Sequence, residues 1–421
     1  HNLLTAEIAD RENPFGWGGV FFLTISVFLE PMMNKVRTYN KISVKGLEKF
    51  SLDKYEIASE IGTPDAIMLR SHVLQPEDIA TSVKAIGRAG AGVNNIPVDN
   101  CTERGIVVFN APGANANAVK ELALAAMLLS TRDIVGAIDF VRNQGPGKTA
   151  EELHSLVEGG KKTYGGTELK GKTLGVVGLG AIGSQVAETG LMLGMKVLGY
   201  DPALSVEAAW RLSREVERME NMQSLLAKSD IVTLHLPVLE ATRNLINKDL
   251  VDSFRPGATL INLSREKVVD TEAILMGLDN GRIGKYITDF PVIEMMGHDK
   301  VVSIPHLGAS TEEAEENCAI MVANQLIDFL ENGNIRNSVN FPNIFLERNG
   351  GFRLAFSNRN VPKMLNQVLS VLADRNINVI DMINKSRGDA AYNIIDIEQE
   401  PTPELIQALE DIDGVIKVRT L

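Results

Sequence analysis

The sequence contains very little cysteine. Only Cys101 and Cys318 occur among its 421 residues, far apart and outside any C-x-x-C spacing. Two isolated cysteines exclude a cysteine-rich metal site, and such scarcity is typical of a reducing compartment. We therefore expect no bound metal and a cytoplasmic location.

The sequence also contains fewer basic than acidic residues. The formal net charge is −12, which argues against a bulk electrostatic grip on nucleic acid or on an anionic membrane. Basic residues that converge on one cleft could still bind a small anionic substrate. We therefore expect a small-molecule substrate, with no nucleic acid and no membrane as partner.

A hydrophobic run of membrane length is missing as well. The apolar stretch Phe15–Leu29 is too short for a comfortable span, and acidic residues stand before it instead of the basic flank of a signal peptide. We interpret residues 1–32 as a non-native or over-extended segment, with the natural start at Met32 or Met33. A genuine membrane anchor is the alternative.

The composition that remains is that of a soluble globular protein. Apolar residues make up 44% and charged residues 23% of the chain. A chain of this length exceeds one ordinary core, so two or three domains are expected.

Two segments alternate short apolar runs with helix-like stretches, which predicts α/β folding around parallel sheets. In the first, from Lys35 to about Arg132, the expected strands are Ala66–Leu69, Ala85–Ile86 and Ile106–Phe109, and the expected helix is Ala118–Leu129. Residues Asn143–Gly166 are predicted to be a loop or short helix that links two domains. After Lys172 the second pattern predicts strands at Thr173–Val177, Lys196–Tyr200, Ile231–Leu234, Thr259–Asn262 and Val301–Ser303.

The last 70 residues follow a different order. Strands and helices alternate as βαββαβ, which predicts a small ferredoxin-like module. The expected strands are Arg353–Ser357, Ile377–Asn384, Tyr392–Glu398 and Gly414–Arg419, and the expected helices are Val361–Arg375 and Pro403–Leu409.

A dinucleotide motif follows the strand Thr173–Val177. Gly178, Gly180 and Gly183 form G-x-G-x-x-G at the start of a helical stretch, where glycines permit a tight turn, close approach to the pyrophosphate and close helix packing. The next strand ends at Asp201, whose carboxylate would bind the ribose hydroxyls and repel the extra phosphate of NADP. The pattern therefore predicts NAD as the cofactor; a glycine-rich turn in a packed domain is the structural alternative.

Three residues at strand ends form a candidate catalytic set: Arg265, Glu294 and His306. Oxidation of a 2-hydroxy acid needs a base for the hydroxyl proton, which suits His306, and Glu294 would orient the imidazole. Arg265 would bind the substrate carboxylate with its planar fork. Each could instead be structural, as a packed histidine, a loop carboxylate or a strand cap, but their order after a dinucleotide motif favours catalysis.

Several longer stretches extend this pattern. They are Leu69-Arg70-Ser71, Gly87–Asn94 (GRAGAGVN), Asn110-Ala111-Pro112, Gly178–Gly183 and Pro305–Thr311 (PHLGAST). With these stretches the chain from Met33 to Leu421 resembles the D-isomer-specific 2-hydroxyacid dehydrogenase family.

The resemblance implies a fold class and a domain plan. It implies a Rossmann-type NAD-binding domain at 132–311, a flavodoxin-like α/β substrate domain at 33–131 and 312–342, and a C-terminal ferredoxin-like ACT regulatory domain at 350–421. It also implies a homodimer or homotetramer. The implied activity is NAD-dependent oxidation of 3-phospho-D-glycerate to 3-phosphohydroxypyruvate, in L-serine biosynthesis, with L-serine as effector.

The same resemblance assigns binding residues. Those expected to line NAD, besides the glycines, are Ala181, Ile182, Asp201, Leu263, Ser264, Asp289, Leu307, Gly308 and Ala309. Those expected to face the substrate are Arg70, Ser71, Ala91 and Gly92. Those expected to bind the effector are Asn358, Asn360 and Asn378.

Two positions depart from the family pattern. Glu266 stands where a glycine usually follows the arginine, and Lys363 replaces a glycine in the effector loop, where it could occlude the serine pocket.

Two other functions remain open from the sequence. One is a general reductase for 2-keto acids such as hydroxypyruvate or glyoxylate, which has less need of an amino-acid sensor. The other is a non-catalytic NAD-sensing protein of the corepressor kind, since a fold alone does not fix a function.

Overall fold

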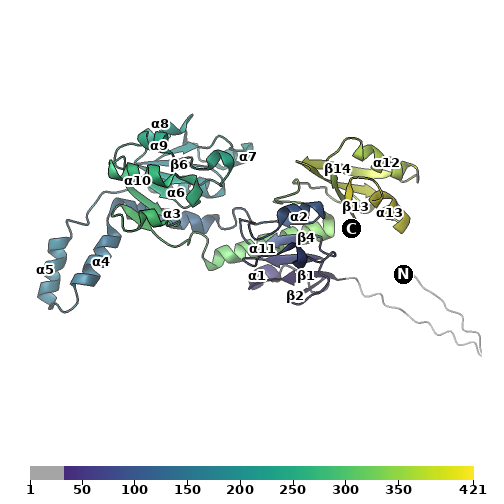
Figure 1. The fold of residues 1–421 in the computed structure, drawn as a ribbon, viewed down its shortest axis with the longest axis horizontal. Helices are drawn as coiled ribbons and strands as arrows, with labels where there is room; N and C mark the ends of the chain where they lie inside the picture. Colours follow the sequence, from purple (N-terminus) through teal and green to yellow (C-terminus); the bar gives the residue numbers. More distant parts are fainter. Residues whose placement is uncertain (1–32) are drawn as a thin grey trace, which may run out of the picture.

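Three β-sheets organise the part of the chain that the computed structural model describes, residues 33–421 (Figure 1). The first two carry the α/β patterns predicted from the sequence, and the third forms the C-terminal module. The interpretation of residues 1–32 falls outside the described residues. None of the helices within residues 33–421 combines the length and apolar character that crossing a bilayer requires.

The first sheet has five parallel strands in the order β2-β1-β3-β4-β5. This is the flavodoxin-like doubly wound order. All four residues of β3 are buried, as expected for a strand covered on both faces. The strands are β1 (Asn34–Thr38), β2 (Tyr55–Ala58), β3 (Ala66–Leu69), β4 (Ala85–Arg88) and β5 (Val107–Phe109); the helices are α1 (Val44–Leu47) and α2 (Val98–Glu103), with the 3₁₀ turn η1 (Pro76–Asp78).

The second sheet has seven parallel strands in the order β12-β11-β10-β9-β6-β7-β8. The strand order reverses between β6 and β9, the place where open α/β sheets bind ligands. The strands are β6 (Thr173–Val177), β7 (Lys196–Tyr200), β8 (Glu217–Arg218), β9 (Ile231–Leu234), β10 (Ala258–Asn262), β11 (Ile283–Thr288) and β12 (Val301–Ser303). The five strands predicted here are confirmed, whereas β11 and the short β8 were not predicted.

Helices and short turns surround this sheet, and α3 packs against α6. The helices are α3 (Ala116–Thr131), α6 (Ala181–Met192), α7 (Val206–Arg211), α8 (Met222–Lys228), α9 (Lys248–Asp252) and α10 (Thr271–Asp279); the 3₁₀ turns are η2 (Glu240–Thr242), η3 (Glu266–Val268) and η4 (Ile293–Met295).

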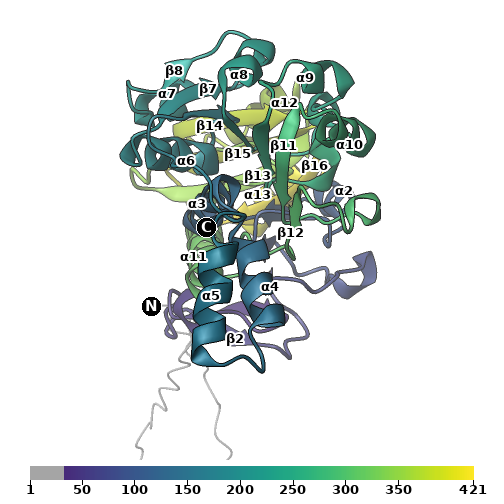
Figure 2. The same cartoon turned by 90° about the vertical axis from the view of Figure 1, so that its left-hand side faces the viewer.

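Two helices extend away from the second sheet as a helical arm, residues 134–160 (Figures 1 and 2). They are α4 (Ile134–Gln144) and α5 (Ala150–Gly160), and neither contains a buried residue. A capping box starts α5, because Thr149 and Glu152 each accept the other's backbone N–H. The prediction of a loop or short helix at 143–166 is confirmed in part: the segment contains loop residues and the 11-residue helix α5, but also the end of α4, which was not predicted.

The third sheet is antiparallel, with the order β14-β15-β13-β16. Side chains of Leu354 and Phe356 pack against two helices on one face, as the two-residue period of a strand requires. The strands are β13 (Phe352–Arg359), β14 (Val379–Arg387), β15 (Ala390–Ile397) and β16 (Val415–Thr420), and the helices are α12 (Met364–Ala373) and α13 (Pro403–Glu410). The predicted βαββαβ order is confirmed.

The other face of the third sheet packs against the first domain through the long helix α11 (Glu312–Asn332). Ala355 and Tyr392 share one apolar core with Phe109 of β5 and with Phe329 and Leu330 of α11. Helix α11 also packs closely on β4, because a Cβ added at Gly87 would lie 2.3 Å from Val322. The N-terminal α/β domain therefore depends on a helix from much later in the chain.

A buried arginine joins the C-terminal module to this core. Arg353 is 1% exposed, and its guanidinium donates to both carboxylate oxygens of Asp396 at 2.6 and 2.7 Å. Its remaining N–H groups donate to the backbone carbonyls of Asn332, Leu346 and Glu347. One side chain thus satisfies the end of α11 and the following segment while it pairs with β15.

Candidate active site

The glycine-rich loop between β6 and α6 has the geometry that the motif predicts. Gly178 has φ +88°, and a Cβ there would lie 2.4 Å from the carbonyl oxygen of His235. A Cβ at Gly183 would lie 1.8 Å from the carbonyl oxygen of Gly178. Only glycine fits either position, so the first N–H groups of α6 are left open to a phosphate.

His235 supports the loop from the neighbouring strand β9. Burial lowers the pKa of His235 to about 4, so the imidazole is neutral near pH 7. Its Nε2 lies 2.9 Å from the hydroxyl of Thr233. This uncharged, packed histidine is a structural neighbour of the loop.

Asp201 lies beside the loop at the end of β7. Its two carboxylate oxygens accept the backbone N–H groups of Leu179, at 2.8 Å, and Ala203, at 2.9 Å. A cavity of about 850 Å³ adjoins this carboxylate. Arg214 and Arg218 also line the cavity, and the sequence did not indicate them because β8 and the turn before it lie outside the motif.

The backbone at Arg265 is held by polar side chains at the end of β10. Buried Asn262 donates to the carbonyl of Arg265 at 3.0 Å and accepts the N–H of Ser264. The Ser264 hydroxyl donates to the carbonyl of Leu234. Glu266 opens the turn η3 without a positive φ, so the missing family glycine does not distort this position.

The structure brings Arg265 and His306 to one aromatic ring. The imidazole of His306 lies 4.5 Å from the ring of Phe290, centroid to centroid, and the Arg265 guanidinium carbon lies 5.8 Å from the same ring. Phe290 was not among the predicted site residues. A base after β12 and an anion-binding group after β10 therefore lie on either side of the end of β11, where Phe290 stands.

Asp289 lies directly behind this group. It is 1% exposed, and its Oδ2 accepts the N–H of Gly308 at 3.2 Å. Burial raises its pKa, while the Gly308 N–H and the nearby His306 and Arg265 act in the opposite direction. The other oxygen, Oδ1, is buried and has no partner within residues 33–421. A buried acceptor without a donor fits a bound group that supplies an N–H.

The position of Glu294 does not match its predicted role as the carboxylate partner of His306. It lies in the turn η4, its side chain is exposed, and no ion pair or hydrogen bond joins it to His306 in the described residues. The carboxylate–imidazole pair expected from the sequence is therefore not formed in this conformation.

The predicted substrate residues gather at the ends of β3 and β4. Arg70 pairs with Glu315 of α11 at 2.7 Å, and the N–H of Ser71 donates to Asn40. The loop that contains Ala91 and Gly92 is held by Asn110, whose side chain donates to the carbonyl of Ala91.

Arg88 joins this group, although the sequence analysis did not select it. It is the last residue of β4, and its Nε donates to the carbonyl of Arg70 at 3.1 Å. Burial lowers the pKa of the Arg88 guanidinium, and the charges of Arg70 and Arg265 lower it further. Arg70, Arg88 and Arg265 therefore lie close enough to influence one another, which concentrates positive charge in an acidic chain.

Comparison with known proteins agrees with this geometry. The family model for the NAD-binding domain of D-isomer-specific 2-hydroxyacid dehydrogenases matches residues 124–308, and the ACT domain model matches residues 352–414. D-3-phosphoglycerate dehydrogenase of Haemophilus influenzae is 34% identical over 388 residues, which cover 89% of this chain and 90% of the relative. The chain belongs to the D-3-phosphoglycerate dehydrogenase family.

Other relatives agree over shorter parts. D-3-phosphoglycerate dehydrogenase of Synechocystis is 38% identical over 70% of this chain, and the chain spans 52% of that longer relative. A crystal structure of NAD⁺-bound 3-phosphoglycerate dehydrogenase from Entamoeba histolytica is 26% identical, with a TM-score of 0.55, and covers 75% of this chain and 100% of the solved one. The predictions of an NAD-dependent oxidoreductase and of a C-terminal ACT domain are thus confirmed.

The three residues predicted to bind the effector, Asn358, Asn360 and Asn378, do not form one cluster within the chain. Asn358 is buried and donates to the carbonyl of Arg359, and Asn360 donates to Gly388 beside the turn that joins β14 and β15. Asn378 donates to Glu398 at the opposite end of that hairpin. Lys363 takes φ +72° at the start of α12, so it keeps the left-handed backbone for which glycine is usual.

Proposed function

We propose that the chain oxidises 3-phospho-D-glycerate to 3-phosphohydroxypyruvate with NAD, as the first step of L-serine biosynthesis. The observation that carries the proposal is the meeting of Arg265 and His306 at Phe290, beside a glycine loop shaped for a dinucleotide. The relatives named D-3-phosphoglycerate dehydrogenase indicate the substrate.

Each proposed catalytic or binding role is assigned to particular residues of this chain. Arg265 binds the substrate carboxylate, and an imidazole nitrogen of His306 takes the proton of the C2 hydroxyl. NAD, held by the glycine loop and Asp201, would supply the hydride acceptor for this oxidation. Arg70 and Arg88 are the proposed cations for the phosphate, and Glu294 is the proposed carboxylate partner of His306. Gly178, Gly183 and Asp201 hold the cofactor, and Asp289 offers its free oxygen to an N–H.

The domain roles follow the same proposal. Residues 132–311 bind NAD, residues 33–131 and 312–342 bind the substrate, and the ACT domain at 350–421 responds to L-serine. Two buried, unpaired cysteines support action in the cytoplasm.

Substrate choice tests the proposal most directly. NADH oxidation by the purified chain should be fastest with 3-phosphohydroxypyruvate, compared with hydroxypyruvate, glyoxylate and 2-ketoglutarate, and should be slowed by L-serine. Turnover of unphosphorylated acids alone would indicate a general 2-keto acid reductase. Bound NADH without any turnover would indicate a sensor.

Substitution of Asp201 by alanine is expected to relax cofactor choice. The change removes the negative charge beside the ribose site and leaves Arg214 and Arg218 in the same cavity, so NADP should become a usable cofactor. Loss of charged hydrogen bonds should weaken NAD binding by about 10- to 100-fold. Fluorescence titration with NADH and NADPH measures both effects. Asp252→Ala, an exposed carboxylate of the same domain, is the control, and an unchanged NADH preference in Asp201→Ala would reject this role.

The exposed apolar side chains of the helical arm support the proposal that the chain forms a homodimer. Six large apolar side chains of this short hairpin are exposed, and exposed apolar groups of this kind mark association surfaces. They are Ile134, Val135, Ile138, Val141, Leu153 and Val157.

Substitution of Ile138 by glutamate should therefore yield a monomer, because burial of an unpaired charge opposes association. Ile138 is 51% exposed in the single chain, so folding should be unaffected. Sedimentation velocity measures the mass, with Asn143→Glu on the same arm as control. A dimer that persists in Ile138→Glu would show that the interface lies outside the helical arm.

A further inference from the structure

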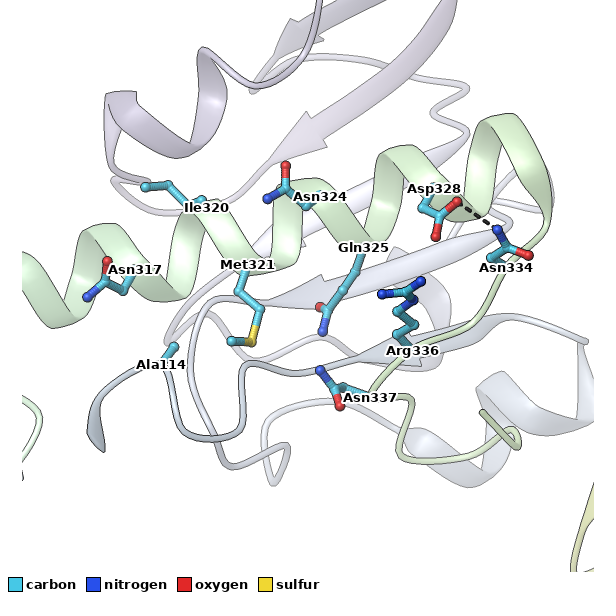
Figure 3. A pocket seen from close by; sticks show the side chains of 10 residues that line it. All are labelled: Ala114, Asn317, Ile320, Met321, Asn324, Gln325, Asp328, Asn334, Arg336 and Asn337. Atoms are coloured by element: carbon cyan, nitrogen blue, oxygen red, sulfur yellow. Dashed lines mark hydrogen bonds between the residues drawn. The ribbon is translucent and has the colours of Figure 1, made fainter. Parts of the chain in front are cut away.

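A second cavity lies away from the catalytic group, along one face of α11 (Figure 3). Its volume is about 670 Å³, within the range typical of small-molecule sites. Asn317, Met321, Asn324 and Asp328 recur every three or four residues and so share this face. The opposite wall comes from Ala114 and from the segment that contains Arg336 and Asn337.

The floor of this cavity contains an unsatisfied acceptor. Gln325 is 7% exposed, and its side-chain N–H donates to the carbonyl of Asn110 at 3.1 Å. Its Oε1 is buried and has no partner within residues 33–421. Figure 3 shows the Gln325 side chain directed toward the wall that contains Arg336 and Asn337. A buried acceptor of this kind costs stability unless a donor from outside the chain reaches it.

Charges of opposite sign stand at the same end of the cavity. Asp328 accepts from Asn332 and Asn334 through Oδ1 alone, which leaves Oδ2 available. The Arg336 guanidinium lies 4.8 Å from the ring of Phe345, and in the described residues it makes no side-chain hydrogen bond and no ion pair with any carboxylate, Asp328 included.

We propose that this cavity binds a free α-amino acid. Gln325 Oε1 and Asp328 Oδ2 would accept from the ammonium group, Arg336 would bind the carboxylate, and the side chain would lie against Met321 and Ala114. One carboxylate is too few for a metal site. One arginine without a stacking aromatic in the lining is a poor fit to a nucleotide.

The cavity is connected to the substrate loop. Gln325 donates to the carbonyl of Asn110, and the Asn110 side chain donates to the carbonyl of Ala91 at 2.5 Å. An amino acid held by Gln325 therefore lies two hydrogen bonds from a proposed substrate residue. Occupancy should change the KM for the hydroxy acid more than kcat, an effect that rests on the proposed function, whereas binding itself does not.

Calorimetric titration of the full chain tests binding without turnover. The twenty standard L-α-amino acids are the probes, with L-lactate, which lacks the ammonium, and ethanolamine, which lacks the carboxylate, as matched controls. At least one amino acid should bind, and neither control compound should. Binding should weaken at least tenfold in Arg336→Gln and in Gln325→Met.

Lys49→Gln is the matched variant. It removes an exposed positive charge of the same domain that has no side-chain partner in the described residues, and it should bind like the unchanged chain. Because Arg336 is exposed, Arg336→Gln should fold normally even where Gln325→Met does not. The proposal is overturned if no amino acid binds, if lactate binds equally well, or if Arg336→Gln binds with unchanged affinity, which would place the bound amino acid in the ACT domain.

Discussion

Replacement of His306 by glutamine is expected to lower kcat by about 10²- to 10⁴-fold, the range typical of a lost general acid–base group. Glutamine keeps hydrogen-bonding capacity and similar length but cannot take up the hydroxyl proton. The side chain is exposed and contacts Phe290 rather than a core, so the fold should be retained. The loss corresponds to about 3–5 kcal/mol of transition-state stabilisation.

Steady-state kinetics with 3-phosphohydroxypyruvate and NADH measures this loss, and NADH binding by fluorescence should change little. His298→Gln is the matched control, since the His298 imidazole lies 3.6 Å from Asp279 and makes no ring contact with Phe290 in the described residues. A variant at His306 that retains more than a tenth of kcat would show that the proton leaves through another group.

Replacement of Arg353 by methionine is expected to destabilise the chain by about 3–5 kcal/mol, the cost typical of removing one partner from a buried ion pair. Asp396 would keep a buried charge with no cation, and three backbone carbonyls would lose their donor. Because this side chain ties the ACT domain to α11, the C-terminal module should also become more accessible to protease.

Urea unfolding followed by circular dichroism, together with limited proteolysis, measures both consequences. Arg348→Met, which removes an exposed arginine near the same segment, should cost much less. The double variant Arg353→Met/Asp396→Leu should recover part of the loss, since no unpaired charge remains. Equal stability of Arg353→Met and Arg348→Met would contradict the assigned role.

Local chemistry explains which parts of the fold could be predicted. The strands β6, β7, β9 and β10 are short apolar runs bounded by turn residues, so their pattern is visible without tertiary information. Strand β11 reads IGKYIT, and its glycine and lysine interrupt the apolar run. The helical arm buries nothing within one chain, yet Ile134, Ile138 and Val141 recur at helical spacing, so the sequence did contain an apolar stripe that indicates α4. The Thr149–Glu152 capping box was the available signal for α5.

The site divides in the same way. The glycine loop and Asp201 depend on a few consecutive residues, and their geometry follows from the motif. Phe290 reaches the site from the end of β11, and nothing in its local sequence marks it. Arg88 lies within the stretch Gly87–Asn94 that resembles the family, but that stretch does not show which of its side chains reaches Arg70. Contact between Glu294 and His306 depends on how η4 is placed relative to β12, which a sequence pattern cannot specify.

The late arrival of α11 has a consequence for synthesis on the ribosome. Strands β1 to β5 emerge about 200 residues before the helix that covers β4, a delay of roughly 10–40 s at ordinary translation rates. During that time the apolar surface of β4 and β5 that Val322 and Phe329 later cover is exposed to solvent and to other proteins. Elongation speed through the NAD-binding region therefore sets how long a nascent chain remains prone to aggregation.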